Sequence, residues 1–287
     1  MLGVAIGGGH GLSASLDALR TIGANSIAIV GVSDDGGSTG MLRDVDPSLP
    51  AVGDARRILS CMIARDNAVA AQLLEYRMRT GALAGHAVGN LMIAALRDLS
   101  GSFQEALAIL GEWFGSDGVV IPASEEPMRL CASSTRGEIV CGQLKVHQMV
   151  GIDKIWLEPA ARASRDAVEA IEQADVVLLG PGSLYTSVLA SLVTPGILEA
   201  LANTKGNVVF VVNLQPQANE TIGFKLADHL DALERHGVRF DACVADPRFA
   251  AAAGVVSSKV CFAEVGDVDG RRHQPDLLAK SLQNLIR

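Results

Sequence analysis

Short apolar runs alternate with amphipathic helical patterns along almost the whole chain. Residues 4–7, 26–32, 175–180 and 207–214 are apolar at successive positions, which is typical of strands buried between two helix layers. Further strands are expected at 154–159 and 240–246. Because strands that alternate with helices form βαβ units, the pattern predicts an α/β fold with a mostly parallel sheet and helices on both faces.

Two segments depart from this alternation. Residues 59–115 are mostly helical, which predicts a helical insertion over the carboxyl edge of the sheet. Residues 128–149 have β-rich arms around a turn at 135–137, which predicts an antiparallel hairpin excursion. We find no linker, internal repeat or low-complexity tract, so we expect a single domain over residues 1–287.

Composition narrows the class of protein. The 287 residues carry a net charge of -8 and no basic run, which argues against extended nucleic-acid binding. No stretch approaches the roughly 18 apolar residues of a membrane span. The five cysteines are scattered without a C-x-x-C pair, so we expect buried thiols and a cytoplasmic protein: Cys61, Cys131, Cys141, Cys243 and Cys261.

The first candidate for chemistry is the glycine-rich turn within residues 6–16, where a strand runs into a helix. Backbone N–H groups in such a turn bind phosphate, and the helix dipole adds attraction. The alternative is a tight turn without a ligand, because the segment has neither the Lys of a P-loop nor a clean G-x-G-x-x-G register. His10 faces the ligand or caps the helix. The candidate residues are Gly8, Gly9, His10 and Gly11.

The second candidate is an acidic glycine loop at the end of another predicted strand. Its carboxylates suit ribose hydroxyls, a Mg²⁺-diphosphate or a general base, although such residues also cap helices. The candidate residues are Asp34, Asp35, Gly36, Gly37 and Ser38.

Four more polar segments follow strand ends or helix starts. Asp54 and Arg56 begin a predicted helix, where a surface salt bridge is the alternative to a ligand contact. Asn90 lies one helical turn from His86, a pair that is more often structural. Residues 178–192 form a second anion-binding turn with hydroxyl donors, and Asn213 belongs to a polar rim beyond the next strand. The candidates in that turn are Gly180, Gly182, Ser183, Tyr185 and Thr186. Metal-ligand spacing is absent, so no metal ligands are assigned.

Six ordered motifs resemble one known family. In chain order they are GGGHG, SDDGGSTG, VGDARR, GHAVGN, LLGPGSLYTS and RRHQPDLLA. Together they resemble the gluconeogenesis factor (YvcK-like) family of the 2-phospho-L-lactate transferase (CofD-like) superfamily, from residue 4 to about residue 280. The resemblance implies a Rossmann-like fold and a cytoplasmic protein that binds UDP-sugars, notably UDP-N-acetylglucosamine. It also implies a role in cell shape and wall-precursor allocation, without an established catalytic activity.

The resemblance adds Arg272 to the candidate site and leaves one rival function. His10 stands where the family commonly has Thr, and Gln274 where it has Asp.

The rival function is a phospholactate-type transferase that acts on a deazaflavin cofactor precursor with a guanosine diphosphate donor. As we interpret the family patterns, the loop Ser33-Asp34-Asp35-Gly36-Gly37 favours the UDP-sugar-binding regulator. We expect no required cofactor, although Mg²⁺ can accompany the ligand diphosphate. Homo-oligomers and regulatory protein partners remain open, with no nucleic acid and no membrane.

Overall fold

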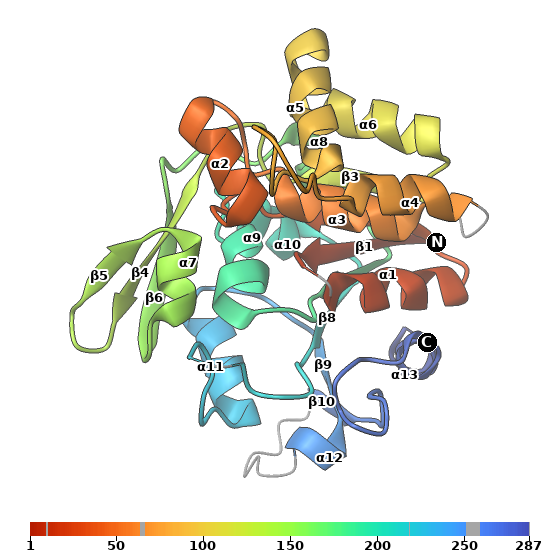
Figure 1. Ribbon diagram of the computed structural model, residues 1–287. Coiled ribbons are helices and arrows are strands. Elements are labelled where there is room, and N and C mark those ends of the chain that lie inside the picture. Colours follow the sequence, from red (N-terminus) through yellow and green to blue (C-terminus); the bar gives the residue numbers. More distant parts are fainter. Residues whose placement is uncertain (10, 64–66, 218, 251–258, 287) are drawn as a thin grey trace.

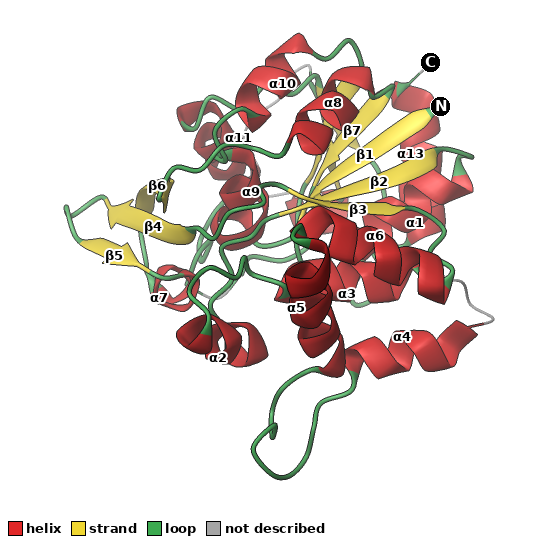
Figure 2. Ribbon diagram, turned by 90° about the horizontal axis from the view of Figure 1, so that it is seen from above, coloured by secondary structure: helices red, strands yellow, loops and turns green. Residues whose placement is uncertain are grey.

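Seven parallel strands form the centre of the protein in a computed structural model that describes residues 1–9, 11–63, 67–217, 219–250 and 259–286 (Figures 1 and 2). The strand order is β10-β9-β8-β7-β1-β2-β3, and every neighbouring pair is parallel. The strands are β1 Leu2–Gly7, β2 Asn25–Val30, β3 Val119–Pro122, β7 Val176–Leu179, β8 Asn207–Val211, β9 Ala242–Ala245 and β10 Val260–Phe262. The predicted Rossmann-like α/β fold is confirmed.

Helices cover both faces of this sheet (Figure 2). α1, α3, α6 and α13 lie on one face, and α8, α9 and α10 on the other. The helices are α1 Gly11–Thr21, α2 Gly37–Val45, α3 Gly53–Met62, α4 Ala68–Glu75, α5 Val88–Ser100, α6 Phe103–Phe114, α7 Gln143–Gln148, α8 Arg165–Gln173, α9 Ala190–Leu192, α10 Ile197–Asn203, α11 Leu226–Arg235, α12 Pro247–Ala250 and α13 Pro275–Leu285. A π-helical segment, η2 Leu184–Leu189, runs directly into α9.

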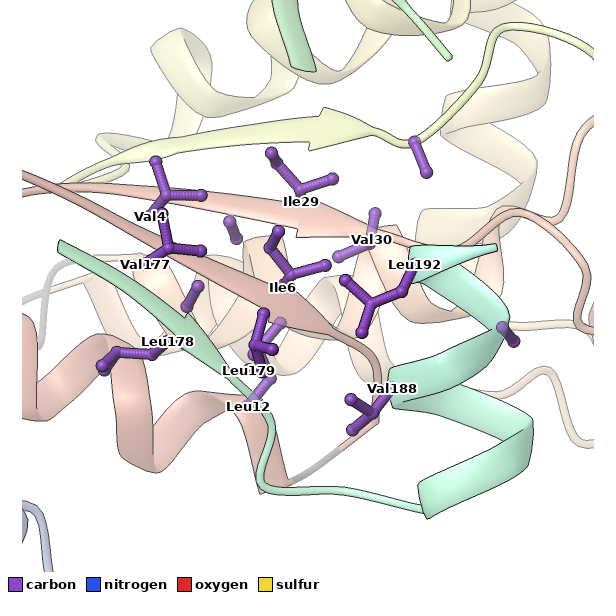
Figure 3. Packing of buried hydrophobic residues seen from close by; sticks show 14 of the residues in the cluster. Val4, Ile6, Leu12, Ile29, Val30, Val177, Leu178, Leu179, Val188 and Leu192 are labelled. Carbon is purple, nitrogen blue, oxygen red and sulfur yellow. The ribbon is translucent and has the colours of Figure 1, made fainter. Parts of the chain in front are cut away.

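The core lies between the sheet and these helices. Side chains of the central strands alternate between the two helix layers, and both sets are buried, as expected for strands apolar on both faces. Ile6, Leu179 and Val188 pack together in the close view of Figure 3. Strands β1, β2, β7 and β8 are therefore central and parallel, as their sequence predicts.

Helices α2 to α6 occupy the chain between β2 and β3, which includes the segment predicted as a helical insertion. Strands β3 and β10 are short and were not expected from the sequence. Among the described residues no single helix is long and apolar enough to cross a membrane; by length and composition alone, the bent pair Leu184–Leu192 and Ile197–Asn203 could.

A second, antiparallel sheet projects from the main body (Figure 1). Its strands β4 Arg129–Ser134 and β5 Ile139–Cys141 form the predicted hairpin, and β6 Ile152–Glu158 pairs with the other edge of β4. The placement of residues 154–159 in the parallel sheet is wrong. Several β6 side chains are exposed, whereas the parallel strands are buried on both faces.

The expectation of five buried thiols is also wrong. Cys131 and Cys141 face each other across the hairpin and form a disulfide, because the register places their Cα atoms 4.0 Å apart. Of the free cysteines, Cys61 is exposed and Cys243 is buried.

Candidate functional site

A cavity of about 1400 Å³ lies at the carboxyl ends of the parallel strands. It is lined by the loops after β1, β2, β7 and β8, by the start of α3, by α7 and by residues 270–275. This is the edge at which open α/β sheets bind ligands. Fifteen of the predicted site residues line it: Gly8, Gly9, Gly11, Asp34, Gly36, Gly37, Ser38, Asp54, Arg56, Asn90, Gly182, Ser183, Thr186, Asn213 and Arg272.

The first glycine loop lies directly against the carboxylate of Asp54. The Gly9 N–H donates a hydrogen bond to that carboxylate, and a Cβ at Gly8 would overlap it. Gly9 has a φ of +68° and open space where a side chain would be, so the backbone faces the cavity without a covering group. The loop then enters α1 at Gly11, whose backbone also lines the cavity.

Asp34 and Asp54 bring two carboxylates to the same wall, with Asp34 half-buried and Asp54 buried. Asp34 accepts hydrogen bonds from the Gly36 N–H, at 3.0 Å, and from the Thr39 hydroxyl, yet burial raises its pKa. Burial, followed by the charge of Asp34, raises the pKa of Asp54 to about 6, although Arg57 pairs with it at 3.0 Å. Burial therefore disfavours the ionised form of both carboxyls in this wall.

Arg56 is almost fully buried, with 2% of its surface exposed. Its guanidinium pairs with Glu75 and lies 3.5 Å from the carbonyl oxygen of Leu74. The ion pair with Glu75 thus engages Nη1 of the arginine, whereas its buried Nε has no hydrogen-bond partner among the described residues. Of the residues that the structure describes, five arginines line the cavity: Arg56, Arg57, Arg77, Arg271 and Arg272.

Ser38 joins the acidic loop to α5. Its hydroxyl oxygen accepts hydrogen bonds from the Asn90 side-chain amide and from the Ala87 N–H, each at 3.1 Å. The hydroxyl is also 3.4 Å from Nδ1 of His86. The His86 and Asn90 pair therefore shares Ser38, and this contact positions the loop against the helix.

The second glycine loop is held by side chains from the loop after β8. Asn213 accepts from the Gly182 N–H at 3.0 Å and donates to the Gly182 carbonyl oxygen at 2.7 Å. The next N–H groups donate to the side chains of Gln217 and Glu220. The N–H groups of Gly182, Leu184 and Tyr185 are consequently not free donors for an anion, contrary to the prediction of a second open anion-binding turn.

Three predicted residues do not line the cavity. Asp35 accepts a hydrogen bond from the Leu144 N–H at 3.0 Å and so caps the start of α7. Gly180 continues the sheet by donating to the Ile6 carbonyl, and buried Tyr185 donates its hydroxyl to the Ile152 carbonyl. His10 lies outside the described residues.

Several lining residues were not expected from the sequence. α7 contributes Gln143, Leu144 and His147, and Nδ1 of His147 lies 2.8 Å from the buried carboxylate of Glu220. Glu220 belongs to the predicted polar rim, but its partner is 73 residues away in the chain. Nothing in the local sequence links the two.

The C-terminal side of the cavity is fixed by His273. Its Nε2 hydrogen-bonds the Val212 carbonyl oxygen at 3.0 Å, which ties residues 270–275 to the sheet. Burial lowers the pKa of His273. A neutral imidazole donating to a carbonyl thus brings Arg272 to the cavity wall.

One three-residue cluster among the described parts of the chain has metal-ligand geometry: Cys131, Cys141 and Glu158. Its two cysteines are joined in a disulfide, so the cluster does not offer thiolate ligands. Asp34 and Asp54 are the other candidate metal ligands in the cavity, because Mg²⁺ commonly binds to one or two carboxylates together with ligand phosphates.

Comparison with known proteins agrees with this architecture. The family model of the 2-phospho-L-lactate transferase CofD matches residues 4–269. A Thermotoga maritima protein named "Putative gluconeogenesis factor" is 40% identical over 81% of this chain and 74% of its own length. A namesake from Aquifex aeolicus is also 40% identical, over 79% of this chain and 72% of its own.

A solved structure covers nearly the whole molecule. A UPF0052 family protein from Bacillus halodurans has a TM-score of 0.88 and 30% identity, covering 98% of each chain. The shared fold, the family match and the curated relatives agree over most of the sequence. The chain belongs to the gluconeogenesis factor (YvcK-like) family of the CofD-like superfamily.

Proposed function

We propose that this protein binds a UDP-sugar, UDP-N-acetylglucosamine, and acts in the cytoplasm as a regulator of carbon allocation and cell-wall morphogenesis. One observation carries the proposal: a single cavity gathers a glycine loop at a helix start, the carboxylates of Asp34 and Asp54, and five arginines of the described chain. These groups suit a ligand that combines a diphosphate with hydroxyl-bearing rings. The names of the curated relatives support the regulatory part.

The diphosphate is assigned to the first glycine loop. Backbone donors and the positive end of α1 favour an anion there, and the assignment needs no basic patch, which suits a net charge of -8. Arg272 is assigned to the uracil and Asp34 to ligand hydroxyls. Asp35 and Asn213 are not assigned to the ligand, because both side chains already hold backbone groups of this chain.

Mg²⁺ fits as a companion of the diphosphate. Asp34 and Asp54 would hold it, since a divalent cation would favour the ionised form of two carboxyls whose pKa is raised mainly by burial. When bound, the ion would neutralise phosphate oxygens. The carboxylates therefore position the ion while the glycine loop orients the ligand.

A phospholactate-type transferase remains the second candidate. The family model that matches residues 4–269 carries that description, and the acidic pair suits metal-assisted phosphoryl transfer. In that function the ligand would be a guanosine diphosphate donor and the acceptor a deazaflavin. No nucleic acid or membrane enters either proposal, whereas protein partners and self-association fit the regulatory one.

Calorimetry with UDP-N-acetylglucosamine, UDP and GDP, with and without Mg²⁺, tests the proposal. We expect UDP-N-acetylglucosamine to bind best, to raise the melting temperature and to be recovered unchanged. Gly182→Val should abolish binding, because a Cβ there already lies 3.3 Å from the Gly8 carbonyl oxygen and the larger side chain would fill the space between the loops. Gly111→Ala, on α6, is the matched control. Preference for GDP with transfer to a deazaflavin would establish the rival.

A further inference from the structure

The wall of the cavity formed by α7 presents one imidazole, that of His147. α7 follows the disulfide-bonded hairpin and lies beside η2 (Figure 1). Two bonds besides that of His147 fix it: the Leu144 N–H donates to Asp35 at 3.0 Å, and the Gln143 side-chain amide donates to the Thr186 carbonyl oxygen at 3.1 Å. The imidazole is thus held on a rigid support.

A buried carboxylate fixes which nitrogen of this ring carries the proton. The Glu220 side chain has no exposed surface, and it accepts hydrogen bonds from the Tyr185 N–H and the Thr186 hydroxyl as well as from His147. An ionised carboxylate has no proton to donate, so it accepts from the imidazole as it does from its other two partners. Nδ1, the nitrogen that faces it, is therefore the protonated one. In the neutral ring, Nε2 then bears the lone pair.

Nε2 is the nitrogen left for a ligand. Within the described part of the chain no residue hydrogen-bonds Nε2, whereas 47% of the His147 side chain is exposed, in the lining of the cavity. A lone pair attracts a hydroxyl proton and repels the oxygens of a phosphate. The α7 wall therefore suits a neutral, hydroxyl-bearing group.

We propose that Nε2 of His147 accepts a hydrogen bond from a hydroxyl group of the ligand's sugar, and that this contact makes His147 a specificity-determining residue. The proposal rests on the proposed function, and it places the sugar at the α7 wall. The diphosphate stays at the first glycine loop, at the start of α1.

A pair of substitutions separates the two ends of the ring. The amide of His147→Asn reaches the position of Nδ1 and can still donate to Glu220, but it places nothing at the position of Nε2. The longer His147→Gln carries its amide oxygen to the position of Nε2. Calorimetry on both variants with UDP-N-acetylglucosamine and with UDP isolates the contact to the sugar.

We expect His147→Asn to weaken UDP-N-acetylglucosamine binding roughly 2- to 10-fold, with UDP affinity unchanged and His147→Gln close to wild type. Equal losses for UDP and its sugar, or an unaltered affinity in His147→Asn, would overturn the assignment. A wild-type protein that binds neither ligand overturns the proposed function as well, which distinguishes the two failures. Deoxy analogues of the sugar identify the hydroxyl, since the relevant analogue no longer distinguishes wild type from His147→Asn.

The tautomer has a test that needs no ligand. NMR of nitrogen-labelled histidine side chains should show Nδ1 protonated and Nε2 unprotonated in wild type. In Glu220→Gln the amide can donate to Nδ1, which moves the ring proton to Nε2 and replaces the acceptor in the cavity by a donor. A wild-type ring protonated at Nε2 when neutral would contradict the proposal.

Discussion

At the scale of single residues, Asp54 combines a structural cost with its position in the site. Its carboxylate is 8% exposed, lies near the charge of Asp34, and has a pKa of about 6 in the folded protein. In the unfolded chain the carboxyl titrates near 3.8. Between these values the native state binds more protons than the unfolded state, so stability falls as pH rises from about 4 to about 6.

Asp54→Asn should therefore stabilise the protein without ligand at pH 7.5. The asparagine cannot ionise, and the removed penalty is at most about 3 kcal/mol, less whatever the lost pair with Arg57 contributed. Urea denaturation at about pH 7.5 and about pH 4.5 measures the difference in unfolding free energy between variant and wild type, which should be smaller at the lower pH. An Asp54→Asn protein destabilised equally at both pH values would contradict this account.

Asp54→Asn should also lose Mg²⁺-dependent ligand affinity, whereas Asp35→Asn should retain it.

Neighbouring residues also show where sequence reasoning stops. Asp34 and Asp35 are chemically identical and adjacent, and the sequence predicts both in the site. Asp34 faces the cavity, whereas Asp35 caps a helix 109 residues further along the chain. The direction of each carboxylate depends on where the hairpin and α7 dock, and a local pattern does not contain that information.

At the scale of elements, two helical glycines illustrate opposite uses of the same residue. Gly89 lies in the first turn of α5, where a Cβ would be 2.8 Å from the Arg56 side chain and 2.8 Å from the Leu74 carbonyl oxygen. Gly111, inside α6, has only ordinary contacts at 3.5 Å and beyond. Close packing therefore requires glycine at the first position and not at the second.

Gly89→Ala should cost about 1–3 kcal/mol of unfolding free energy, because the added methyl group displaces a buried arginine. Gly111→Ala should instead stabilise by about 0.5–1 kcal/mol, since alanine is the better helix former and the site has room. Equilibrium denaturation of the two variants checks the signs. If both substitutions changed the unfolding free energy in the same direction, the close contacts at Gly89 would not be the reason for glycine at that position.

Elements were predictable where one physical signal dominated. Strands apolar on both faces identified β1, β2, β7 and β8, and the turn at 135–137 identified the hairpin. β6 was misplaced because a half-exposed strand of mixed polarity fits either sheet. The three-residue β10 and the four-residue β3 carry too few positions for a periodic signal.

At the scale of the whole molecule, the fold and the position of the site follow from the sequence, but the contacts within the site do not. Glycine loops after strands of a parallel sheet must meet at one edge, so the cavity could be predicted. The sequence predicts only a polar rim for the loop after β8. It instead satisfies the second glycine loop through Asn213, Gln217 and Glu220, at separations of 31 to 35 residues. Such pairings depend on tertiary docking.

Asp246 connects the end of β9 to the segment that carries Arg272. Its fully buried carboxylate accepts hydrogen bonds from the N–H groups of Val265 and Gly266, each at 2.9 Å, and pairs with Arg248 at 2.7 Å. Burial alone would raise the pKa of Asp246, but the bonds from Arg248 and the backbone lower it well below its usual range. The charged form is thus favoured in the folded state.

Asp246→Asn should destabilise the protein by about 3 kcal/mol at pH 7, because an amide NH₂ replaces an acceptor that faces backbone donors and Arg248. A carboxyl with a depressed folded pKa contributes stability above its unfolded pKa, and that contribution is lost as pH falls below about 4. The difference between variant and wild type should therefore narrow between pH 7 and about pH 3 in urea denaturation. Asp98→Asn, at an exposed pair on α5, is the control and should change stability by less than about 0.5 kcal/mol.

Asp246→Asn should also lower ligand affinity, because the hydrogen bonds of Asp246 to Val265 and Gly266 help to hold residues 270–275 at the cavity. Unchanged affinity would show that His273 alone holds them.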